Sequence, residues 1–473
     1  MSTDVTKPRV EYTSMLPSVE KNRAAVGGQR VVNAGGTKFL EPLASMLCST
    51  SVVDGQSTVT YNATMGLEGQ AHYKKYLSNA YFLGVTGMTV IGLSGLISAK
   101  KPVKDIPSSV EFLDKNINGK GQSLRDFSDE AINEAFTAVW SGVLVARPTT
   151  PEGSSKLDEE TQNLRPKLLH YKFESIINWD YEVINNIEKL SLLVLKESTT
   201  ERKGFEVETV DQYRVLELIN GVYNQSLYNK DGNLIAGQES KPVIFNGKTS
   251  DEIPFYWIVA GTRTKSVIDD LVDCNFQHYN VYADYGSKLH YSSFIIYTEN
   301  SDNQNSNNNM VMGNGVKWNG PLEGSFGVLQ PDGNSDGHRI ALQDIQVLMS
   351  SLLASILKPR TSGAESAEAK SLDQVTQNTV TASVALTVSE AIQKGLNFAS
   401  RTMGGAEDAV FELNTDYDPT LLNAQLLSVM LAARMSGDMS KETLYENLQK
   451  GDIANPDRTF EEEQILIANT GIE

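Results

Sequence analysis

Between residues 264 and 384 the sequence predicts, in order, a long helix, an asparagine-rich excursion, a second helix, a break that contains Pro and Gly, and a third helix. Residues 266–291 place apolar and aromatic side chains at helical spacing, with acidic side chains between them. Unbroken, this helix would be about 39 Å long at roughly 1.5 Å per residue. Helical spacing resumes over residues 343–357, and Lys358-Pro359 ends it. The first helix fits two interpretations: an ordinary amphipathic helix, or a helix that packs against copies of itself around a polar channel.

Two segments lack the apolar content of a core. Residues 298–315 (TENSDNQNSNNNMVMGNG) and 148–166 (PTTPEGSSKLDEETQNLRP) are predicted to be exposed loops. After the first of these, Trp318, Phe326, Val328 and Leu329 stand among Gly and Pro, which indicates a small β element.

The chain before residue 140 is predicted to be a polar arm followed by helices. Residues up to Lys38 are interpreted as a polar, partly mobile arm, and residues 41–100 as packed helices. A further helix is expected over residues 128–139, because Ser128 supplies a cap and acidic residues follow it. Residues 140–146 then turn strand-like.

Signals from residue 168 to residue 258 favour β structure. The runs 192–195, 213–219 and 222–228 are rich in β-favouring residues, and Asn220-Gly221 between two of them is a strong hairpin signal. Further turns are marked at Asp231-Gly232 and Asn246-Gly247. A small antiparallel sheet is therefore expected.

Residues 80–98 (AYFLGVTGMTVIGLSGLIS) are uncharged and long enough to raise the question of a membrane span. Four glycines, together with Thr and Ser, weaken a continuous helix. A buried helix pair broken near the glycines is favoured over a transmembrane helix.

Charge and cysteine content narrow the function further. The formal net charge is -18, which disfavours tight binding of nucleic acid but permits DNA to slide past without adhering. Cys48 and Cys274 provide neither a disulfide framework nor metal-ligand spacing. The N-terminus lacks the pattern of a secretory signal, so the chain is expected to stay in the cell that makes it.

Catalytic motifs are absent from the sequence. There is no GxxxxGK[ST] phosphate loop, no HExxH and no GxSxG, and the five histidines are scattered. Glu461-Glu462-Glu463 is interpreted as a solvated acidic face rather than a metal site. The sequence thus predicts no enzyme, no cofactor and no metal.

Four segments in this order resemble a family of tailed-bacteriophage portal (head-to-tail connector) proteins, an uncharacterised-domain family of podovirus-like and related phages. They are TVIGLSGLISAKKP at 89–102, YKFESIINWDYE at 171–182, SVIDDLVDCNFQHYNVYADYGSKLHY at 266–291, and the helix at 349–358 before an alanine-rich run. The resemblance covers most of the chain. The individual motifs are structural rather than catalytic, and the resemblance rests on their occurring in the same order along the chain. The Asn-rich loop departs from the family in its length.

The resemblance implies an α+β, elongated, ring-forming portal fold with a mixed α/β wing, long stem helices, a small α/β clip and a helical C-terminal crown. The implied parts are the arm and wing at 1–263, first stem helix at 264–291, clip at 292–341, second stem helix at 342–357, tunnel loop at 358–367, long helix and wing return at 368–420, and crown at 421–473.

A portal forms the ring at the capsid vertex through which double-stranded DNA is packaged and ejected, and docks the packaging motor and then the tail adaptor. The implied partners are other copies of the chain, usually twelve, together with duplex DNA, the terminase large subunit, the head–tail adaptor, and the major capsid protein and scaffold, with no membrane. The implied location is the virion, and the host cytoplasm during assembly.

The resemblance also assigns candidate residues. The tunnel loop facing DNA is Lys358, Pro359, Arg360, Thr361, Ser362 and Gly363, where Lys358 and Arg360 are candidates for transient phosphate contacts or are a solvated pair at a helix end. The channel stem is assigned Asp269, Asp270, Asp273, Asp284 and Lys288, and the clip contact with the adaptor is assigned Lys317, Trp318 and Arg339.

Three alternatives remain open from the sequence. Another head–tail structural protein would lack two stem helices around an axis, and a membrane-associated oligomeric channel would use residues 80–98 as its span. An enzyme with a carboxylate site would group Glu174 and Asp180 in a pocket with raised pKa values.

Overall fold

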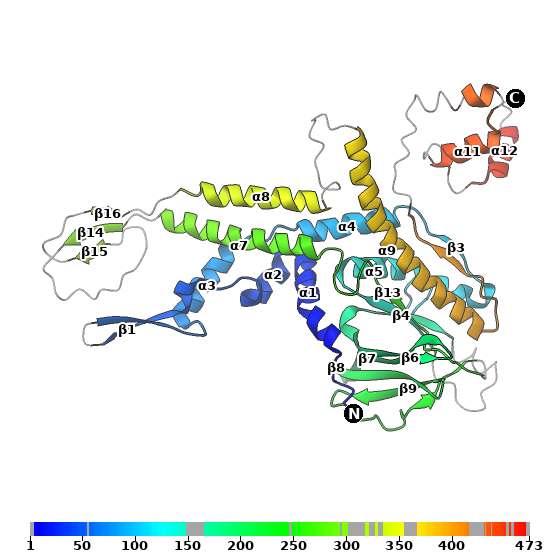
Figure 1. Ribbon diagram of the computed structural model, residues 1–473, viewed down its shortest axis with the longest axis horizontal. Coiled ribbons are helices and arrows are strands. Elements are labelled where there is room, and N and C mark those ends of the chain that lie inside the picture. Colours follow the sequence, from blue (N-terminus) through cyan, green and yellow to red (C-terminus); the bar gives the residue numbers. More distant parts are fainter. Residues whose placement is uncertain are drawn as a thin grey trace. The chain divides into compact units, whose positions relative to one another are not determined.

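The computed structural model shows a mixed α and β chain that divides into two compact units, residues 1–415 and 416–473 (Figure 1). The α+β class predicted from the sequence is confirmed. The structure describes residues 4–53, 56–147, 165–245, 248–293, 296–300, 317–320, 327–329, 334–353, 367–415, 430, 432–436, 438–450, 454–455 and 458–469. The segment predicted as a loop at 148–166 and the Asn-rich segment at 298–315 lie mostly outside these ranges, as does the turn at Asn246-Gly247.

The N-terminal segment is a packed part of the larger unit. It forms α1 (Val10–Gly27) and α2 (Gln29–Gly35), and Val19, Ala25 and Val32 are fully buried. The side-chain amide of buried Asn22 donates to the Thr137 carbonyl oxygen at 2.9 Å. The expectation of a polar, partly mobile arm up to Lys38 was therefore wrong, because α1 and α2 bury apolar side chains and Asn22 against the rest of the unit.

Residues 41–100 contain a hairpin as well as helices. Two short 3-10 turns, η1 (Gly36–Lys38) and η2 (Ala44–Leu47), lead into β1 (Cys48–Val53), which pairs in antiparallel register with β2 (Gln56–Tyr61). Helices α3 (Leu67–Asn79) and α4 (Val85–Ser98) follow. The all-helical prediction for residues 41–100 was wrong for β1 and β2 and was confirmed for the helices α3 and α4 that follow them.

The uncharged segment at 80–98 contains one helix, α4, which begins at Val85 after α3 has ended at Asn79. The expected buried helix pair broken near the glycines was therefore wrong, since Gly87, Gly92 and Gly95 lie inside α4 and Met88 and Ile91 are exposed. A Cβ atom on Gly87 would lie 2.8 Å from the Val26 carbonyl oxygen of α1, so this glycine permits the close approach of two helices. In the described part of the chain, no helix is both long and apolar enough to cross a membrane.

A second group of elements builds the main core. Helix α5 (Leu124–Thr137) begins earlier than predicted, because the hydroxyl oxygen of Ser123 accepts a hydrogen bond from the Asp126 amide at 3.1 Å and caps it. Strands β13 (Phe255–Ile258), β4 (Ser141–Ala146) and β5 (Lys167–Tyr171) form one antiparallel sheet in that order. The long helix α9 (Ala367–Thr402) packs against α5, β4 and β13, and it follows α8 as the third helix of the predicted order does. Nearby, β3 (Val103–Asp105) pairs with β17 (Val410–Glu412), and η3 (Ser108–Asp114) contacts α9.

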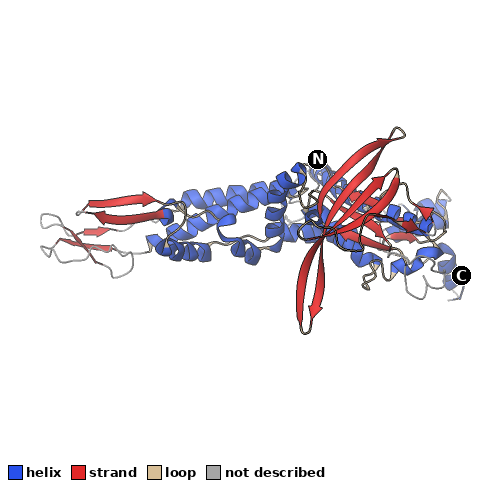
Figure 2. Cartoon of the chain, turned by 90° about the horizontal axis from the view of Figure 1, so that it is seen from below, coloured by secondary structure: helices blue, strands red, loops and turns tan. Residues whose placement is uncertain are grey.

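The predicted antiparallel sheet is present as five strands in the order β10-β9-β8-β7-β6. Strands are drawn in red in Figure 2. Its strands are β6 (Ile176–Ile184), β7 (Ile187–Lys203), β8 (Glu206–Ile219), β9 (Val222–Asn229) and β10 (Lys241–Pro242), preceded by η4 (Phe173–Ser175). Asn220 and Gly221 connect β8 to β9 with φ values of 53° and 75°, the positive values that a type I′ turn requires. The hairpin prediction is confirmed. Strands β11 (Ile244–Phe245) and β12 (Lys248–Thr249) pair beside it.

The remaining elements of the larger unit are α7 (Asp269–Ser292), β14 (Ile296–Asn300), β15 (Lys317–Gly320), β16 (Gly327–Leu329) and α8 (Asp336–Leu353). The three strands form a sheet in the order β15-β14-β16, so the small β element predicted after the Asn-rich segment is confirmed. The smaller unit contains α11 (Lys441–Lys450) and α12 (Phe460–Asn469), in the region where helices were expected.

Candidate functional site: the α7 and α8 helix pair

Helix α7 forms because its apolar residues recur at helical spacing behind an acidic first turn. Asp269 and Asp270 lie in that turn, where carboxylates favour the positive end of the helix dipole. The Asp269 carboxylate also accepts from the Ser266 amide at 3.1 Å, which closes the N-terminus. The buried face consists of Leu271, Val272, Phe276, Tyr279 and Ala283.

Helix α8 begins at Asp336, ahead of the predicted start at residue 343. The Asn334 side-chain oxygen accepts from the Asp336 amide at 3.0 Å, and Arg339 pairs with Asp336 at 2.9 Å within the first turn. Arg339 therefore lies in the first turn of α8, and its contact with an adaptor, which the resemblance implies, stays a prediction. The missed signal was the Asn-Ser-Asp run at 334–336, which is a typical helix start.

The two helices pack side by side and run in opposite directions (Figures 1 and 2). Leu271 near the start of α7 forms one apolar cluster with Ile345 and Met349 of α8. Further along α7, Nε2 of His278 lies 3.1 Å from the Gln346 side-chain nitrogen, and the ring of Tyr285 stacks on that of His338 with centroids 6.3 Å apart. At the far end Lys288 donates to the Asn334 carbonyl oxygen. Burial lowers the pKa of His278, so its ring joins the interface in the neutral form at pH 7.

The acidic residues assigned to the channel stem contact other elements of the same unit. Asp269 accepts from Asn22 at 2.7 Å, Asp273 pairs with Lys21, and Asp284 accepts from the Tyr76 hydroxyl at 2.6 Å. Asp270 forms an ion pair with Lys265 at 2.7 Å. These four carboxylates lie on α7 and are occupied by contacts with α1, α3 and the preceding loop, and Lys288 donates to the Asn334 carbonyl oxygen ahead of α8. The place of these five residues on a channel wall stays a prediction.

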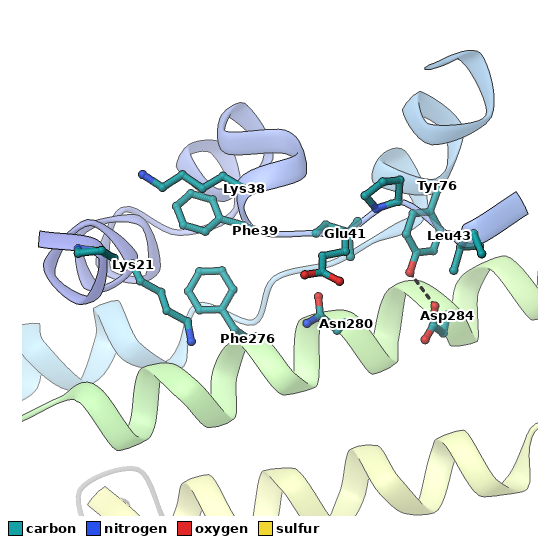
Figure 3. Close-up of a pocket in the computed structure, with 13 residues that line it drawn as sticks. Lys21, Lys38, Phe39, Glu41, Leu43, Tyr76, Phe276, Asn280 and Asp284 are labelled. Atoms are coloured by element: carbon teal, nitrogen blue, oxygen red, sulfur yellow. Dashed lines mark hydrogen bonds between the residues drawn. The ribbon is translucent and has the colours of Figure 1, made fainter. Parts of the chain in front are cut away.

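A groove of about 700 Å³ runs along the side of α7 opposite α8 (Figure 3). Phe276 and Tyr76 are its buried apolar floor, and Phe39 packs on Phe276 with ring centroids 5.2 Å apart. The segment after η1 forms one wall. Charged groups stand at the rim: Lys21, Lys38, Glu41 and Asp284. The remaining lining residues are Pro17, Leu40, Pro42, Leu43, Ala44 and Asn280.

The face of α8 that points away from α7 carries apolar side chains exposed to solvent. Ile340 is 53% exposed and Val347 is 68% exposed, and the two lie seven residues apart on the same side of the helix. Leu348 and Leu352 continue this surface. The exposed Asp344 lies among these apolar side chains. We call this surface the α8 stripe and define it as Ile340, Asp344, Val347, Leu348 and Leu352.

The other assigned residues are described less fully. Lys358, Pro359, Arg360, Thr361, Ser362 and Gly363, the tunnel-loop candidates, lie outside the described residues. Lys317 and Trp318 lie in β15, which pairs in parallel with β14. Their backbone is placed in the small sheet.

The carboxylates proposed for a catalytic pocket are engaged in ion pairs. Burial alone would raise the pKa of Glu174, but two hydrogen bonds from the Arg23 guanidinium at 2.8 Å outweigh it and lower the pKa. Asp180 lies 3.7 Å from Arg9. The raised pKa expected of a catalytic acid is absent at Glu174. Among the residues that the structure describes, no cluster of His, Cys, Asp and Glu could hold a metal ion.

Comparison with known families places one label on this region. A domain of unknown function (DUF4055) matches residues 268–403, from the start of α7 to the end of α9. Domains of this kind occur in phage proteins. No curated protein matches the sequence.

Proposed function

We propose that the chain is the portal protein of a tailed phage: a subunit of a closed ring at the capsid vertex through which double-stranded DNA enters and leaves. The observation that carries the proposal is the antiparallel pair of α7 and α8, joined at one end through a small three-stranded sheet and followed by the long helix α9. The matched domain begins and ends with this set of elements and occurs in phage proteins. In this proposal, α7 and α8 are the stem, the sheet is the clip, and the smaller unit is the crown.

The negative net charge of the chain fits a channel through which DNA slides better than a protein that binds DNA tightly. Duplex DNA carries about one negative charge per 1.7 Å of axis, so a wall of like charge would keep the sliding duplex from adhering. With a formal net charge of -18 per subunit, a ring would present a repulsive bore except where cationic side chains project. Lys358 and Arg360 are the residues proposed to make brief phosphate contacts.

Work on the DNA must come from a partner in this proposal, because the sequence has no phosphate-binding loop for a nucleoside triphosphate. A terminase large subunit would supply hydrolysis during packaging, and a tail adaptor would later bind the clip. The capsid protein and scaffold would hold the ring at its vertex. The ring would serve as a passive channel throughout.

Native mass spectrometry and two-dimensional electron-microscope averages of the purified chain test the proposal. A closed ring with a hole wide enough for duplex DNA is expected. A monomer at all concentrations would refute it, and an assembly without a central hole would favour another head–tail structural protein.

A second experiment addresses the tunnel loop. Deleting Arg360 to Ala364 should leave the rings intact while impairing DNA packaging or retention, since the deletion removes the cationic Arg360 and the Ser-Gly pair that follows it. Loss of the ring itself would contradict the assignment of these residues to the loop. Deletion of the same number of residues at 303–307, within the Asn-rich segment, serves as the control.

A further inference from the structure

Helix α7 carries a buried histidine at its contact with α8. His278 is 2% exposed, and its Nε2 atom lies 3.1 Å from the side-chain nitrogen of Gln346 in α8. Its Nδ1 atom is buried and has no hydrogen-bond partner among the described residues. The ring of Tyr282 stacks on that of His278 with centroids 6.2 Å apart. One ring nitrogen therefore has a polar neighbour, and the other has none in this part of the chain.

The charged side chains around this ring are engaged elsewhere. Helix α4, which contacts α7, has no charged side chain between Val85 and Ser98. On α8, Asp336 pairs with Arg339, and Asp344 belongs to the α8 stripe, which points away from α7. The titratable neighbours of His278 one turn away on α7 are the thiol of Cys274 and the phenol of Tyr282.

The remaining charged groups of α7 contact other elements or the ends of the helix pair. They pair as Asp269 with Asn22 and Asp273 with Lys21 of α1, Asp284 with Tyr76 of α3, Asp270 with Lys265, and Lys288 with Asn334, while His338 of α8 stacks on Tyr285. Burial is the cause that lowers the pKa of His278, and no charged neighbour offsets it. A positive charge on the ring would therefore lack a counter-ion among the described residues.

We propose that His278 is an acid-sensitive switch in the packing of α8 on α7: the helices pack while the ring is neutral and separate more readily once the ring is protonated. Protonation adds a second N–H donor and a positive charge, and Nδ1 has no acceptor within reach in the described interface. A buried charge without a counter-ion is unfavourable, so the charged ring favours a state in which water reaches it. The inference concerns this helix pair and holds whether or not the chain is a portal.

Helix α8 is held by a small interface, which makes it sensitive to such a charge. Its buried side chains in the described part of the chain are Leu342, Ile345 and Met349, and α7 is the element that it mainly contacts. Ile345 and Met349 form one apolar cluster with Leu271 of α7. With so little apolar burial to offset the charge, the response should be seen in α8 before the rest of the unit unfolds.

The pH range follows from the direction of the pKa shift. In the separated state the ring has its usual pKa of 6.5, and burial lowers the pKa in the packed state. The packing is therefore at full strength above pH 6.5 and weakens as the pH falls below 6.5 toward the packed-state pKa. From pH 7.5 to pH 5.5 the equilibrium constant for packing should fall by up to about tenfold, the limit for a ring that stays neutral when packed.

Hydrogen–deuterium exchange of the full chain, read by mass spectrometry over residues 336–353, measures this packing. The protection factor compares the native chain with the denatured chain at the same pH, so the chemical pH dependence of exchange cancels. Protection of α8 should fall by up to about tenfold from pH 7.5 to pH 5.5. A local readout is needed because His170 on β5 is also buried with a lowered pKa and would contribute to a global unfolding midpoint.

Two variants change the response in different ways. His278→Gln removes the titrating ring and keeps a polar group beside Gln346, so the protection of α8 should no longer depend on pH. Gln346→Glu places a carboxylate beside the ring at an exposed position, so the fold should persist. That carboxylate should raise the packed-state pKa of His278 above 6.5 and reverse the sign, with more protection at pH 5.5 than at pH 7.5.

The matched control is His338→Gln, which removes another histidine from the same helix pair and should keep the native response. Unchanged protection of α8 in the native chain between the two pH values would overturn the proposal. So would a pH response that survives in His278→Gln, or a Gln346→Glu variant that still loses protection at pH 5.5. Each of these results is independent of whether the chain forms a ring.

Discussion

The buried ion-pair network that joins α1 to the body of the larger unit offers the sharpest test of how this fold is held together. Arg23 of α1 donates to Glu134 of α5 at 2.6 and 2.7 Å and to Glu174 of η4 at 2.8 Å. The Glu134 side chain is only 3% exposed, whereas Glu174 is 41% exposed and Arg23 is 31% exposed. Glu134 therefore depends on Arg23, while water can solvate Glu174.

Replacing Arg23 with Met would leave the Glu134 carboxylate buried without its cation. Breaking a buried ion pair by removing one partner costs about 3–5 kcal/mol, and the partial exposure of Arg23 favours the lower end of that range. The larger unit spans 415 residues. At about 2.1 cal/mol/K of unfolding entropy per residue, a loss of about 3 kcal/mol lowers its midpoint of thermal unfolding by roughly 3 to 4 °C.

Differential scanning calorimetry at matched protein concentration measures this change. Glu174→Gln is the control, because removal of a half-exposed carboxylate should cost less than about 1 kcal/mol, or roughly 1 °C. The double variant Arg23→Met/Glu134→Gln removes both charges while keeping an acceptor for the Phe173 amide, so it should recover most of the loss. An Arg23→Met midpoint that stays at the native value, or a double variant less stable than the single one, would refute the reasoning.

Two further predictions concern packing and acid stability. Gly87→Ala should lower the free energy of unfolding, measured by chemical denaturation, by about 1–3 kcal/mol, because its Cβ would clash with the Val26 carbonyl oxygen. The control is Gly84→Ala, whose Cβ meets no atom within 4 Å and which should not destabilise the chain. Equal denaturation midpoints for the two variants would contradict the close approach of α1 and α4. Burial alone would raise the pKa of Glu197, but hydrogen bonds, first of all from Arg214, lower the pKa below the usual value of 4.5. The ionised Glu197 therefore stabilises the fold above pH 4.5, and this contribution is lost as the pH falls through the folded-state pKa. Glu197→Gln should therefore flatten the fall in thermal midpoint on acidification below pH 4.5, and an unchanged slope would count against it.

Periodicity and turn chemistry predict the regular elements of this chain well. The Asn220-Gly221 hairpin, the strand at 141–146 and the long helix α9 follow from local signals, because each residue pattern has one favourable backbone solution. Helices α7 and α8 were likewise expected, although α8 starts earlier because of its Asn-Ser-Asp cap.

The N-terminal helix and the first hairpin were missed for different reasons. Asn22 and Arg23 of α1 are bonded to distant residues, and sequence alone does not separate a polar group satisfied by the protein from one satisfied by water. The hairpin of β1 and β2 had a readable signal: Asp54-Gly55 lies between two runs rich in Ser, Thr and Val, a pattern typical of a two-residue connection.

The sequence predicts the two helices of the candidate site, but it does not predict which side chains of other elements contact them or where the groove lies. Spacing indicated which residues of α7 are apolar, whereas the partners Asn22, Lys21 and Tyr76 of its carboxylates come from segments about 200 residues or more away. The groove likewise depends on tertiary packing of α1, α3 and α7. Long-range contacts of this type leave no local pattern in a single sequence.

The joint between α7 and α8 has a consequence for how such chains can vary. Lys288 donates to the Asn334 carbonyl oxygen and Tyr285 stacks on His338, so both ends of the intervening segment are held together by the helices themselves. Because these contacts lie at the helix pair, insertions or deletions between residues 301 and 316 are expected to leave the packing of α7 on α8 intact.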